Sequence, residues 1–404
     1  MIYSIALYLY ALAVVLVSPF RKKAWLMVKG QWNTFRILRK NIRREEMYVW
    51  FHAASLGEFE QGRPLMERLR HPEYKILLTF FSPSGYEVRK DYEGADVVCY
   101  LPFDTPGNVR SFLRLARPRM AFFIKYEFWN NYLHACRRRQ IPVYSVSSIF
   151  RENQVFFRWY GRSYSDVLRC VTHFFVQNEA SRELLARKGI TNVTVAGDTR
   201  FDRVLDICWQ AKDLPLVKAF KQDAKVLVAG SSWAPDEDLI IPYFNAHPEM
   251  KLVLAPHVVS EDHLKEIEGK LRRPFVRYSR VTEESAARAD CLIIDGYGLL
   301  SSIYRYGEMA YVGGGFGVGI HNVPEAAVYG VPVLIGPNNR KFREAQDLLR
   351  EGGCMEVTDA DTFGRTMDRL LSDGKFLAER GRIAGQYIER NAGASDLIFD
   401  SVKF

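Results

Sequence analysis

The sequence predicts an α/β protein of two domains, each built on a parallel, doubly wound sheet. Its 404 residues exceed one ordinary domain and suit two domains of about 150–200 residues each. From Met47 onward, short β-rich apolar runs alternate with amphipathic helical stretches, and the alternation starts afresh near Lys225. Near-continuous apolar strands of this kind are typical of parallel sheets that are covered on both faces. The apolar fraction of 48% is enough for a core in each domain.

Residues 1–20 are predicted to anchor the chain in a membrane. They carry no charged side chain, and Pro19 can end their helix. An apolar segment of about 18–20 residues is just long enough to span the hydrocarbon core, and it can also lie in the interface. A cleaved signal peptide has basic residues before its apolar segment, whereas here they follow it. By the positive-inside rule, basic residues after the segment predict that the rest of the chain lies in the cytoplasm. The alternative is a buried helix of the globular domain.

Residues 21–46 are predicted to be a basic juxtamembrane segment. Nine Lys or Arg and no Asp or Glu lie between Arg21 and Arg44, together with Trp25 and Trp32. Mixed tryptophan and basic side chains are typical of the membrane interface. The formal net charge of +9 suits an acidic partner. Because the basic cluster lies beside an apolar segment, it favours an anionic membrane surface over nucleic acid.

The rest of the chain divides into an N-terminal Rossmann-like domain over residues 47–210, a C-terminal one over 211–375, and helices over 376–404 that are expected to pack back across the junction. The two domains are expected to face a cleft. The strands expected in the first domain are 47–55, 75–83, 96–104, 120–128, 142–148, 173–177 and 193–198. Those expected in the second are 225–232, 251–258, 291–295, 309–317, 332–337 and 354–358. Ligands of open α/β sheets bind beyond the carboxyl ends of the strands, so residues directly after these runs are the candidates for function.

Glu58 follows the first strand, in the motif HAASLGEFEQGRP. Ser55 or Gly57 can begin the next helix, which puts Glu58 in the first turn of that helix. A carboxylate facing the cleft can accept a proton from an attacking hydroxyl. The same carboxylate can instead cap the helix N–H groups, and the residues alone leave both roles open.

Glu127 and Arg200 follow two other strands of the N-terminal domain. Glu127 lies in the aromatic run IKYEFWNN, where a carboxylate needs a basic partner. Arg200, in GDTRFD, can supply that partner because both residues lie at carboxyl ends of strands. The sequence alone does not decide whether each residue has a structural role in an ion pair or a catalytic role.

Strand ends of the C-terminal domain suit a phosphate ligand. Small residues at a strand–helix junction expose backbone N–H groups, and serine hydroxyls add further donors. The candidates at these junctions are Ser231, Ser232, Gly298 and Leu299. Pro256 and His257 follow another strand and are expected to face the cleft, where the histidine can contact a ligand or be a satisfied loop residue.

The motif YVGGGFGVGIHNVPEAAVYGVPVLIGP is the strongest signal in the C-terminal domain. Its glycines, which end with Gly319, make a loop that a ligand can approach closely. His321, Asn322 and Glu325 then arrive at a helix start, and the last two share one helical face, where they can hold ribose hydroxyls. A capping box from Asn322 to Glu325 is the alternative. The spacing does not meet the dinucleotide fingerprint.

Motifs for metals and for other enzyme classes are not found in the sequence. It contains no HExxH, no Cys/His quartet, no GxSxG and no P-loop. Six scattered cysteines without a CxxC pair predict reduced, mostly buried thiols. A nucleotide-sugar enzyme without a metal stabilises its leaving phosphate with helix N-termini and basic side chains.

Taken together, these motifs resemble those of the 3-deoxy-D-manno-octulosonic acid (Kdo) transferases of Gram-negative lipid A biosynthesis, a family of glycosyltransferases with the GT-B fold. The resemblance runs from about Met47 to Leu349. It rests on HAASLGE, the YEFW block, GD-x-[KR]-FD, GSS-x-x-x-x-E, and GIHNVPE followed by G-x-P-V-L-x-GP.

The resemblance implies that Glu58 is the catalytic base and that Glu127 and Arg200 assist the transition state. Contacts with the CMP part of the donor would involve Ser231, Ser232, Pro256, His257, Tyr297, Gly298, Leu299, Gly319, His321, Asn322 and Glu325. The chain departs from the family pattern at Pro256-His257, where Pro-Arg-His is common, at Arg200, where Lys is usual, and at Ile320, where Gly is common. These departures bear more on the donor contacts than on the base.

The implied reaction is an inverting, metal-independent transfer of Kdo from CMP-Kdo to a lipid A precursor, lipid IVA, in lipopolysaccharide core biosynthesis. Glu58 would deprotonate an acceptor hydroxyl, which attacks the ketosidic carbon while CMP leaves. No cofactor is implied. The catalytic domains would lie on the cytoplasmic face of the inner membrane.

Two other functions fit the same residues. Another GT-B enzyme that uses a UDP-sugar, a transferase or an epimerase, would share the fold and differ in its donor. The other is a membrane-anchored protein that binds nucleotides without catalysis. Mutation of Glu58 distinguishes the two, because only an enzyme can lose turnover.

Overall fold

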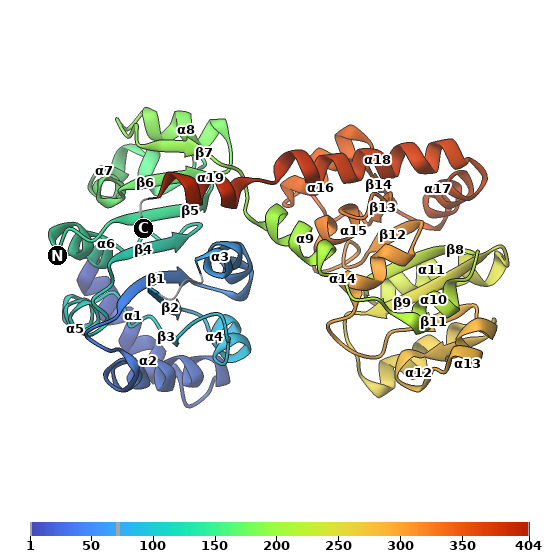
Figure 1. Cartoon of the computed structure of the whole chain (residues 1–404), viewed down its shortest axis with the longest axis horizontal. Helices are drawn as coiled ribbons and strands as arrows, with labels where there is room; N and C mark the ends of the chain where they lie inside the picture. The colour runs from blue at the N-terminus through green and yellow to red at the C-terminus, as the bar shows by residue number, and fades with distance from the viewer. Residues whose placement is uncertain (1, 70–72, 403) are drawn as a thin grey trace. The chain divides into compact units, whose positions relative to one another are not determined.

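The computed structural model describes residues 2–69, 73–402 and 404, and it divides into two compact units (Figure 1). Unit 1 comprises Met1–Arg203 and Ala392–Phe404, and unit 2 comprises Val204–Asn391. The division thus falls before the 210/211 boundary expected from the sequence, and the helices of 376–404 are shared between the units. Met1, the first residue of the predicted anchor, lies outside the described residues.

Unit 1 contains a seven-stranded parallel sheet in the order β3-β2-β1-β4-β5-β6-β7. Its strands are β1 Met47–Ala53, β2 Tyr74–Phe80, β3 Val97–Tyr100, β4 Met120–Ile124, β5 Val143–Ser148, β6 His173–Val176 and β7 Val193–Val195. Consecutive side chains enter different cores: Trp50 belongs to one apolar cluster and Phe51 to another. Since successive side chains of a strand point to opposite faces, the sheet is covered on both faces, as predicted.

Helices connect the strands of unit 1. They are α3 Leu56–Arg68, α4 Pro83–Arg89, α5 Pro106–Ala116, α6 Asn130–Arg138, α7 Arg162–Ser165, α8 Glu179–Ala186 and α9 Arg200–Trp209, the last of which crosses the division between the units. Several begin with Pro in the first turn or with a side-chain cap, such as Asn178, whose Oδ1 accepts from the Ser181 N–H at 2.8 Å.

Unit 2 repeats the architecture, with the strand order β10-β11-β9-β8-β12-β13-β14, all parallel. Its strands are β8 Lys225–Ser232, β9 Met250–Pro256, β10 Phe275–Arg277, β11 Cys291–Ile293, β12 Met309–Val312, β13 Val333–Ile335 and β14 Cys354–Glu356. The two parallel sheets confirm the predicted fold class. Sequence reasoning missed β10, an edge strand of three residues that is too short to show a periodicity.

The helices of unit 2 lie between these strands and after them. They are α10 Pro215–Lys221, α11 Ala234–Ala246, α12 Glu261–Lys270, α13 Glu283–Arg288, α14 Leu300–Ile303, α15 Val323–Ala327, α16 Arg343–Glu351, α17 Ala360–Ser372 and α18 Gly374–Asn391. Asp347 links α16 to α18, since it accepts a hydrogen bond from Tyr387 at 3.2 Å and pairs with Arg343 at 3.5 Å.

The chain returns to unit 1 after α18. Helix α19, Ala394–Ser401, carries Ile398, which enters the apolar cluster of unit 1 together with Val402. Asp202 fixes the start of α19: its carboxylate accepts from the Gly393 N–H at 2.5 Å and from the Ser395 N–H at 2.7 Å. Residues far apart in the sequence thus complete one core.

Two helices precede β1: α1, Ile2–Val17, and α2, Lys22–Asn41. Among the described residues, neither helix by itself has the length and apolar character needed to cross a membrane; the two pass that test only as a pair, and the pair is bent by 119°. One side of α1 contacts unit 1, because Tyr3 donates to Asp104 at 2.8 Å and Tyr10 packs edge-on against Phe103. Most of residues 21–46 form α2, which packs on unit 1. Leu38 of α2 is fully buried in an apolar cluster there.

Candidate active site

Glu58 lies in the first turn of α3, directly after β1. Ser55 is the N-cap residue, with an extended backbone and no side-chain hydrogen bond to the helix. The Glu58 carboxylate folds back over the strand end, where Oε2 accepts from the Ala54 N–H at 2.5 Å. Glu58 thus fulfils part of the capping role considered from the sequence, because it accepts a hydrogen bond from one backbone N–H group.

The surroundings of Glu58 raise the pKa of its carboxyl group to about 7. Burial is the main cause, and the negative charge of Glu127 adds to it, while the Ala54 N–H and the charge of Lys125 act against the rise. A carboxylate with a pKa near neutral is matched to accepting a proton at physiological pH. The position and the pKa of Glu58 both suit a general base.

Glu127 follows β4 and is held by two ring nitrogens. Trp129 Nε1 donates to Glu127 Oε2 at 2.6 Å, and His52 Nε2 lies 3.3 Å from the same oxygen. His52 is fully buried in β1, and its other ring nitrogen lies 2.9 Å from the Thr79 hydroxyl. Sequence reasoning expected a basic partner for Glu127 but did not single out His52 or Trp129. A histidine within a wholly apolar strand was the available signal, because a buried polar ring needs partners.

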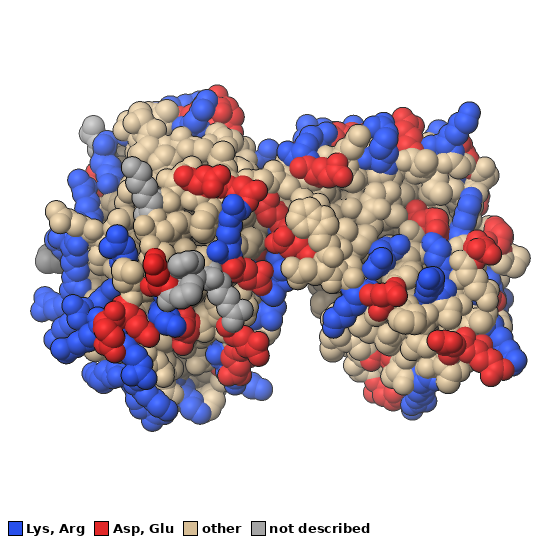
Figure 2. All heavy atoms as spheres, viewed as in Figure 1, with Lys and Arg blue, Asp and Glu red and all other residues tan. Residues whose placement is uncertain are grey.

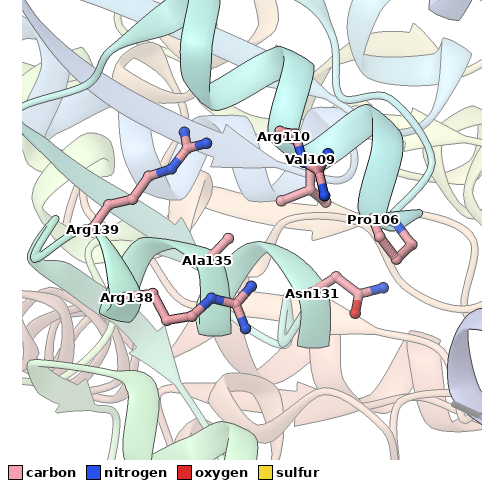
Figure 3. A pocket seen from close by; sticks show the side chains of 7 residues that line it. All are labelled: Pro106, Val109, Arg110, Asn131, Ala135, Arg138 and Arg139. Carbon is pink, nitrogen blue, oxygen red and sulfur yellow. The ribbon is translucent and has the colours of Figure 1, made fainter.

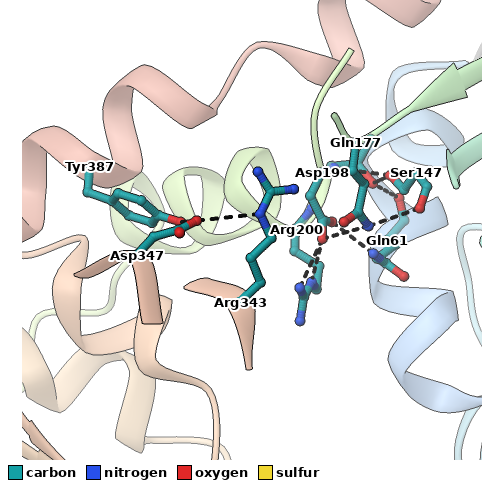
Figure 4. A network of polar contacts seen from close by, with 9 residues as sticks. Gln61, Ser147, Gln177, Asp198, Arg200, Arg343, Asp347 and Tyr387 are labelled. Carbon is teal, nitrogen blue, oxygen red and sulfur yellow. Dashed lines mark hydrogen bonds and ion pairs between the residues drawn. The ribbon is translucent and has the colours of Figure 1, made fainter. Parts of the chain in front are cut away.

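Arg200 is positioned by a buried carboxylate, Asp198, as Figure 4 shows. The Arg200 Nη2 lies 2.9 Å from Asp198 Oδ2. Gln61 and Gln177 donate to the same carboxylate at 2.8 and 3.1 Å. Burial acts to raise the pKa of Asp198, but the charge and hydrogen bonds of Arg200, with that of Gln61, bring it below its ordinary value. Asp198 is therefore a fixed anion that orients the guanidinium.

Arg200 also lies near the loop that carries Glu127. Burial raises the pKa of Tyr126, the residue before Glu127, and the charges of Arg151 and Arg200 oppose that rise. Lys125 enters this loop with a left-handed backbone, φ 67°, a conformation that costs energy in a residue with a side chain. Unit 1 thus brings Glu58, Glu127 and Arg200 to the same edge of its sheet.

The β8–α11 junction of unit 2 contains Ser231 and Ser232. A bulge between Gly230 and Ser232 gives Ser231 a left-handed backbone, φ 53°, and leaves its side chain partly exposed. Ser232 is fully buried, and its hydroxyl donates to Glu237 at 2.9 Å. Of the two predicted serines, Ser232 therefore supports the junction from within, and Ser231 is the one that can reach a ligand.

Three stacked rings lie beside this junction. The His257 ring stacks on Trp233, with centroids 4.7 Å apart, and on His321, with centroids 4.5 Å apart. Trp233 Nε1 donates to His321 Nε2 at 3.1 Å. Burial and the neighbouring His257 lower the pKa of His321, so its ring is neutral at physiological pH. The structure brings together His257 and His321 from the prediction and adds Trp233, which sequence reasoning did not single out.

Asn322 and Glu325 lie close together, as their spacing predicted. Asn322 Nδ2 donates to Glu325 Oε1 at 2.7 Å. Asn322 precedes α15 but makes no side-chain cap, so the capping box considered from the sequence does not form. Its side chain is exposed and can contact a ligand.

The remaining predicted donor residues differ in accessibility. Tyr297 is 77% exposed, and Gly298 beside it has a left-handed backbone, φ 86°. Pro256 is buried as the last residue of β9, and Leu299 is partly exposed. Pro256 thus offers a ligand little surface.

Most of the glycines after β12 serve the packing of the chain. A Cβ at Gly313 would lie 2.3 Å from the Ser231 carbonyl oxygen, and one at Gly315 would lie 2.5 Å from the Gly336 Cα. Asp236, which is fully buried, ties the loop to α11 by accepting from the Gly314 N–H at 2.8 Å. These glycines were interpreted from the sequence as room for a ligand, but at Gly313 and Gly315 the neighbouring backbone occupies that room.

Arginines line two grooves on unit 1. In the groove between α5 and α6, Arg110, Arg138 and Arg139 surround a cavity of about 520 Å³ (Figure 3). Four more arginines line a groove between α2 and α5: Arg39, Arg44, Arg114 and Arg117. The described residues that line the two grooves include no acidic side chain. Sequence reasoning found the basic residues of α2 but not those of α5 and α6, which lie far along the chain.

Comparisons with known proteins show what the chain is similar to. Residues 31–203 match the family model described as 3-deoxy-D-manno-octulosonic-acid transferase (kdotransferase). A 3-deoxy-D-manno-octulosonic acid transferase of Aquifex aeolicus is 26% identical over 371 residues, which are 88% of this chain and 97% of that protein. The enzyme of the same name from Bordetella pertussis is 26% identical over 93% of this chain and 92% of its own length.

Solved structures share the fold at low sequence identity. A UDP-GlcNAc 2-epimerase from Neisseria meningitidis aligns with a TM-score of 0.62 and 17% identity, covering 88% of this chain and 99% of its own. Acinetobacter baumannii MurG aligns with a TM-score of 0.55 and 10% identity, covering 88% and 98%. These likenesses support a GT-B-like fold. The chain is a glycosyltransferase that is similar to the 3-deoxy-D-manno-octulosonic acid transferases along most of its length.

Proposed function

We propose that this enzyme transfers Kdo from CMP-Kdo to a hydroxyl group of lipid IVA, a lipid A precursor, with inversion at the ketosidic carbon and without a metal ion. The observation that carries the proposal is Glu58, a partly buried carboxyl at the carboxyl edge of the sheet, with a pKa of about 7 and Glu127 nearby. The similarity of the chain to 3-deoxy-D-manno-octulosonic acid transferases supports the choice of sugar.

In the proposed reaction, Glu58 takes the proton of the acceptor hydroxyl. The hydroxyl oxygen forms a bond to the ketosidic carbon of Kdo while the bond from that carbon to the CMP phosphate oxygen breaks. Arg200, held by Asp198, stabilises negative charge as it develops. Direct attack by the acceptor, with no enzyme-bound sugar, inverts the configuration at this carbon.

The donor nucleotide is proposed to bind unit 2. Asn322 and Glu325 present an amide and a carboxylate that suit ribose hydroxyls. Ser231 and the backbone at Gly298 and Leu299 offer donors for the phosphate, and the stacked His257 and His321 rings offer a flat surface for the nucleobase.

The reaction is tested by supplying CMP-Kdo, generated in the assay, to the full-length protein with a tetra-acylated, bis-phosphorylated lipid A precursor. Product mass reports the transfer, and Glu58→Gln measured beside wild type tests the base. We expect turnover in wild type and its loss in a folded Glu58→Gln protein. Absence of turnover with CMP-Kdo, together with binding of a uridine nucleotide sugar, would contradict the choice of donor and favour a related GT-B enzyme.

We further propose that unit 1 binds the cytoplasmic face of the inner membrane. The exposed side of α1 is apolar, with Leu9 and Leu16 both more than 60% exposed. Lys and Arg side chains gather on unit 1 near α2 and α5 (Figure 2). The 16-residue α1 would extend about 24 Å, less than the hydrocarbon thickness of about 30 Å, so it would lie along the interface.

A further inference from the structure

An apolar slot lies between α1, α2 and the segment that joins β3 to α5. Its volume is about 460 Å³. Apolar side chains that line it are Leu12, Val15, Val28, Trp32, Phe35 and Phe103. A slot of this composition excludes charged and strongly hydrated groups and accepts a hydrocarbon chain.

One polar group in the slot lacks a partner. Gln31 is only 5% exposed, and its Oε1 accepts from the Phe103 N–H at 3.0 Å. Its Nε2 is buried and has no hydrogen-bond partner among the residues that the structure describes. A buried amide donor without an acceptor is unfavourable, and buried polar groups of native proteins are nearly always paired. An occupant that carries an oxygen acceptor, such as an ester or amide carbonyl, would satisfy this donor.

The slot is connected to the proposed catalytic carboxylates within unit 1. Phe103 packs against Phe81, with ring centroids 6.1 Å apart, and Phe81 packs against Trp129 at 4.6 Å. Trp129 in turn donates to Glu127. The slot thus lies at one end of a run of packed side chains whose other end is Glu127.

The rim of the slot lies on the face proposed to contact the membrane. Trp32 is 77% exposed and Leu12 is 55% exposed, which suits contact with lipid. A hydrocarbon chain can thus enter the slot from a bilayer without crossing water.

We propose that the slot holds one acyl chain of the lipid acceptor, with a carbonyl oxygen of that chain accepting from Gln31 Nε2. This inference rests on the proposed function and adds a recognition site for the lipid part of the acceptor. The site would make transfer depend on the length of the acyl chain, because each methylene buried in an apolar pocket adds to binding.

The test compares transfer to two acceptors that share the phosphorylated sugar and differ in acyl length, both in mixed detergent micelles at a fixed surface concentration. For wild type, we expect kcat/KM to be about tenfold or more higher for the long chain. Val15→Trp fills the slot and should reduce this preference to about threefold or less. The matched control is Leu16→Trp, which alters the next residue of α1 outside the slot and should keep the preference.

A second variant guards against misfolding of the first. Gln31→Met keeps the size of the side chain but removes the buried donor, together with the acceptor of the Phe103 N–H, and it should raise KM for both acceptors because both carry the acyl carbonyl. Thermal unfolding checks that each variant is folded. Equal transfer to both acceptors by wild type would overturn the slot while leaving the proposed reaction intact, as would a preference that survives Val15→Trp or an unchanged KM in Gln31→Met. No transfer to either acceptor would instead reject the proposed function.

Discussion

At the residue scale, Glu58 and Glu127 are two carboxylates with different surroundings. Glu58 is partly buried, and its carboxylate accepts a short hydrogen bond from the Ala54 backbone. Glu127 is fixed by the rings of His52 and Trp129. Pairs of acidic groups whose environments differ in this way are often given different tasks in catalysis. The structure suits Glu58 to exchange a proton and Glu127 to keep a fixed position beside it.

The activity should follow the titration of Glu58. Its carboxyl has a pKa of about 7, and only the deprotonated form can accept a proton, so kcat/KM should fall as the pH falls below about 7. Glu58→Gln should lower kcat by about 10²- to 10⁴-fold and remove this acidic limb. The control is Glu60→Gln: Glu60 pairs with Arg89 at 2.8 Å, outside the carboxylate pair, and its variant should keep the limb. If the residual activity of Glu58→Gln keeps the acidic limb of the pH profile, that limb belongs to another titrating group.

The same titration should affect stability. The pKa of Glu58 rises from its ordinary 4.5 to about 7 on folding, so the unfolded state binds fewer protons between these values and stability falls as the pH rises through this window. Above the window, Glu58→Gln removes a buried charge and should raise the free energy of unfolding by about 1–3 kcal/mol. Denaturant unfolding at pH 5 and pH 8 measures this, and the gain should be present only at pH 8. A loss of stability at pH 8 would mean that the carboxylate supports the fold.

At the element scale, the strands were predictable and the support of the site was not. Apolar runs located every strand except β10, because buried parallel strands leave a continuous signal. Glu58, Glu127 and Arg200 followed from their positions after strands. His52, Trp129 and Asp236 were not singled out, because their roles depend on contacts with residues far along the chain. The bend between α1 and α2 was likewise missed, because the composition of two helices does not determine the angle between their axes.

The loop after β12 gives a test of backbone packing. Gly313→Ala places a Cβ 2.3 Å from the Ser231 carbonyl oxygen and 2.7 Å from the Ser232 Cα, both backbone atoms that cannot easily move. We expect a loss of about 1–3 kcal/mol in the free energy of unfolding. Gly317→Ala is the matched control, because a Cβ there meets no atom within 4 Å. Equal stability of the two variants, measured by thermal unfolding, would show that the loop can move away from Ser231.

Helix α19 gives a second test at this scale. Asp202→Ala removes the carboxylate that accepts from the Gly393 and Ser395 N–H groups and should lower the free energy of unfolding of unit 1 by about 1–2 kcal/mol. Asp400→Ala, an exposed change on the same helix, is the control. Hydrogen exchange of α19 should accelerate in the first variant and not in the second. Unchanged exchange in Asp202→Ala would mean that the apolar contacts of Ile398 hold the helix alone.

At the scale of the whole molecule, the excess positive charge belongs to unit 1. Unit 1 contains 33 of the 56 Lys and Arg residues and 20 of the 47 Asp and Glu residues. Unit 2 contains the other 23 basic and 27 acidic residues. Unit 2 is therefore slightly acidic, although the chain as a whole is basic. Attraction to an anionic surface should act on unit 1 alone.

Binding to vesicles tests this asymmetry. Full-length protein should bind vesicles that contain anionic phospholipid more tightly than zwitterionic ones, and added salt should weaken the binding. R138Q/R139Q removes two arginines of the α5–α6 groove and should cost about 1 kcal/mol for each charge. R182Q/R187Q removes two arginines that are paired with Glu179 and Glu152 and should cost less. Equal losses in the two double variants would mean that total charge, rather than the groove, determines binding.

The return of the chain to unit 1 has a consequence for biosynthesis. The core of unit 1 includes Ile398 and Val402, which the ribosome adds only after all of unit 2 has been made. Unit 2 is continuous in sequence and can fold as soon as it emerges, whereas unit 1, begun first, waits with an open apolar surface until α19 arrives. During synthesis, the earlier-made half of this enzyme is therefore the last to complete its core, because the apolar surface that α19 buries stays uncovered until the C-terminus has been made.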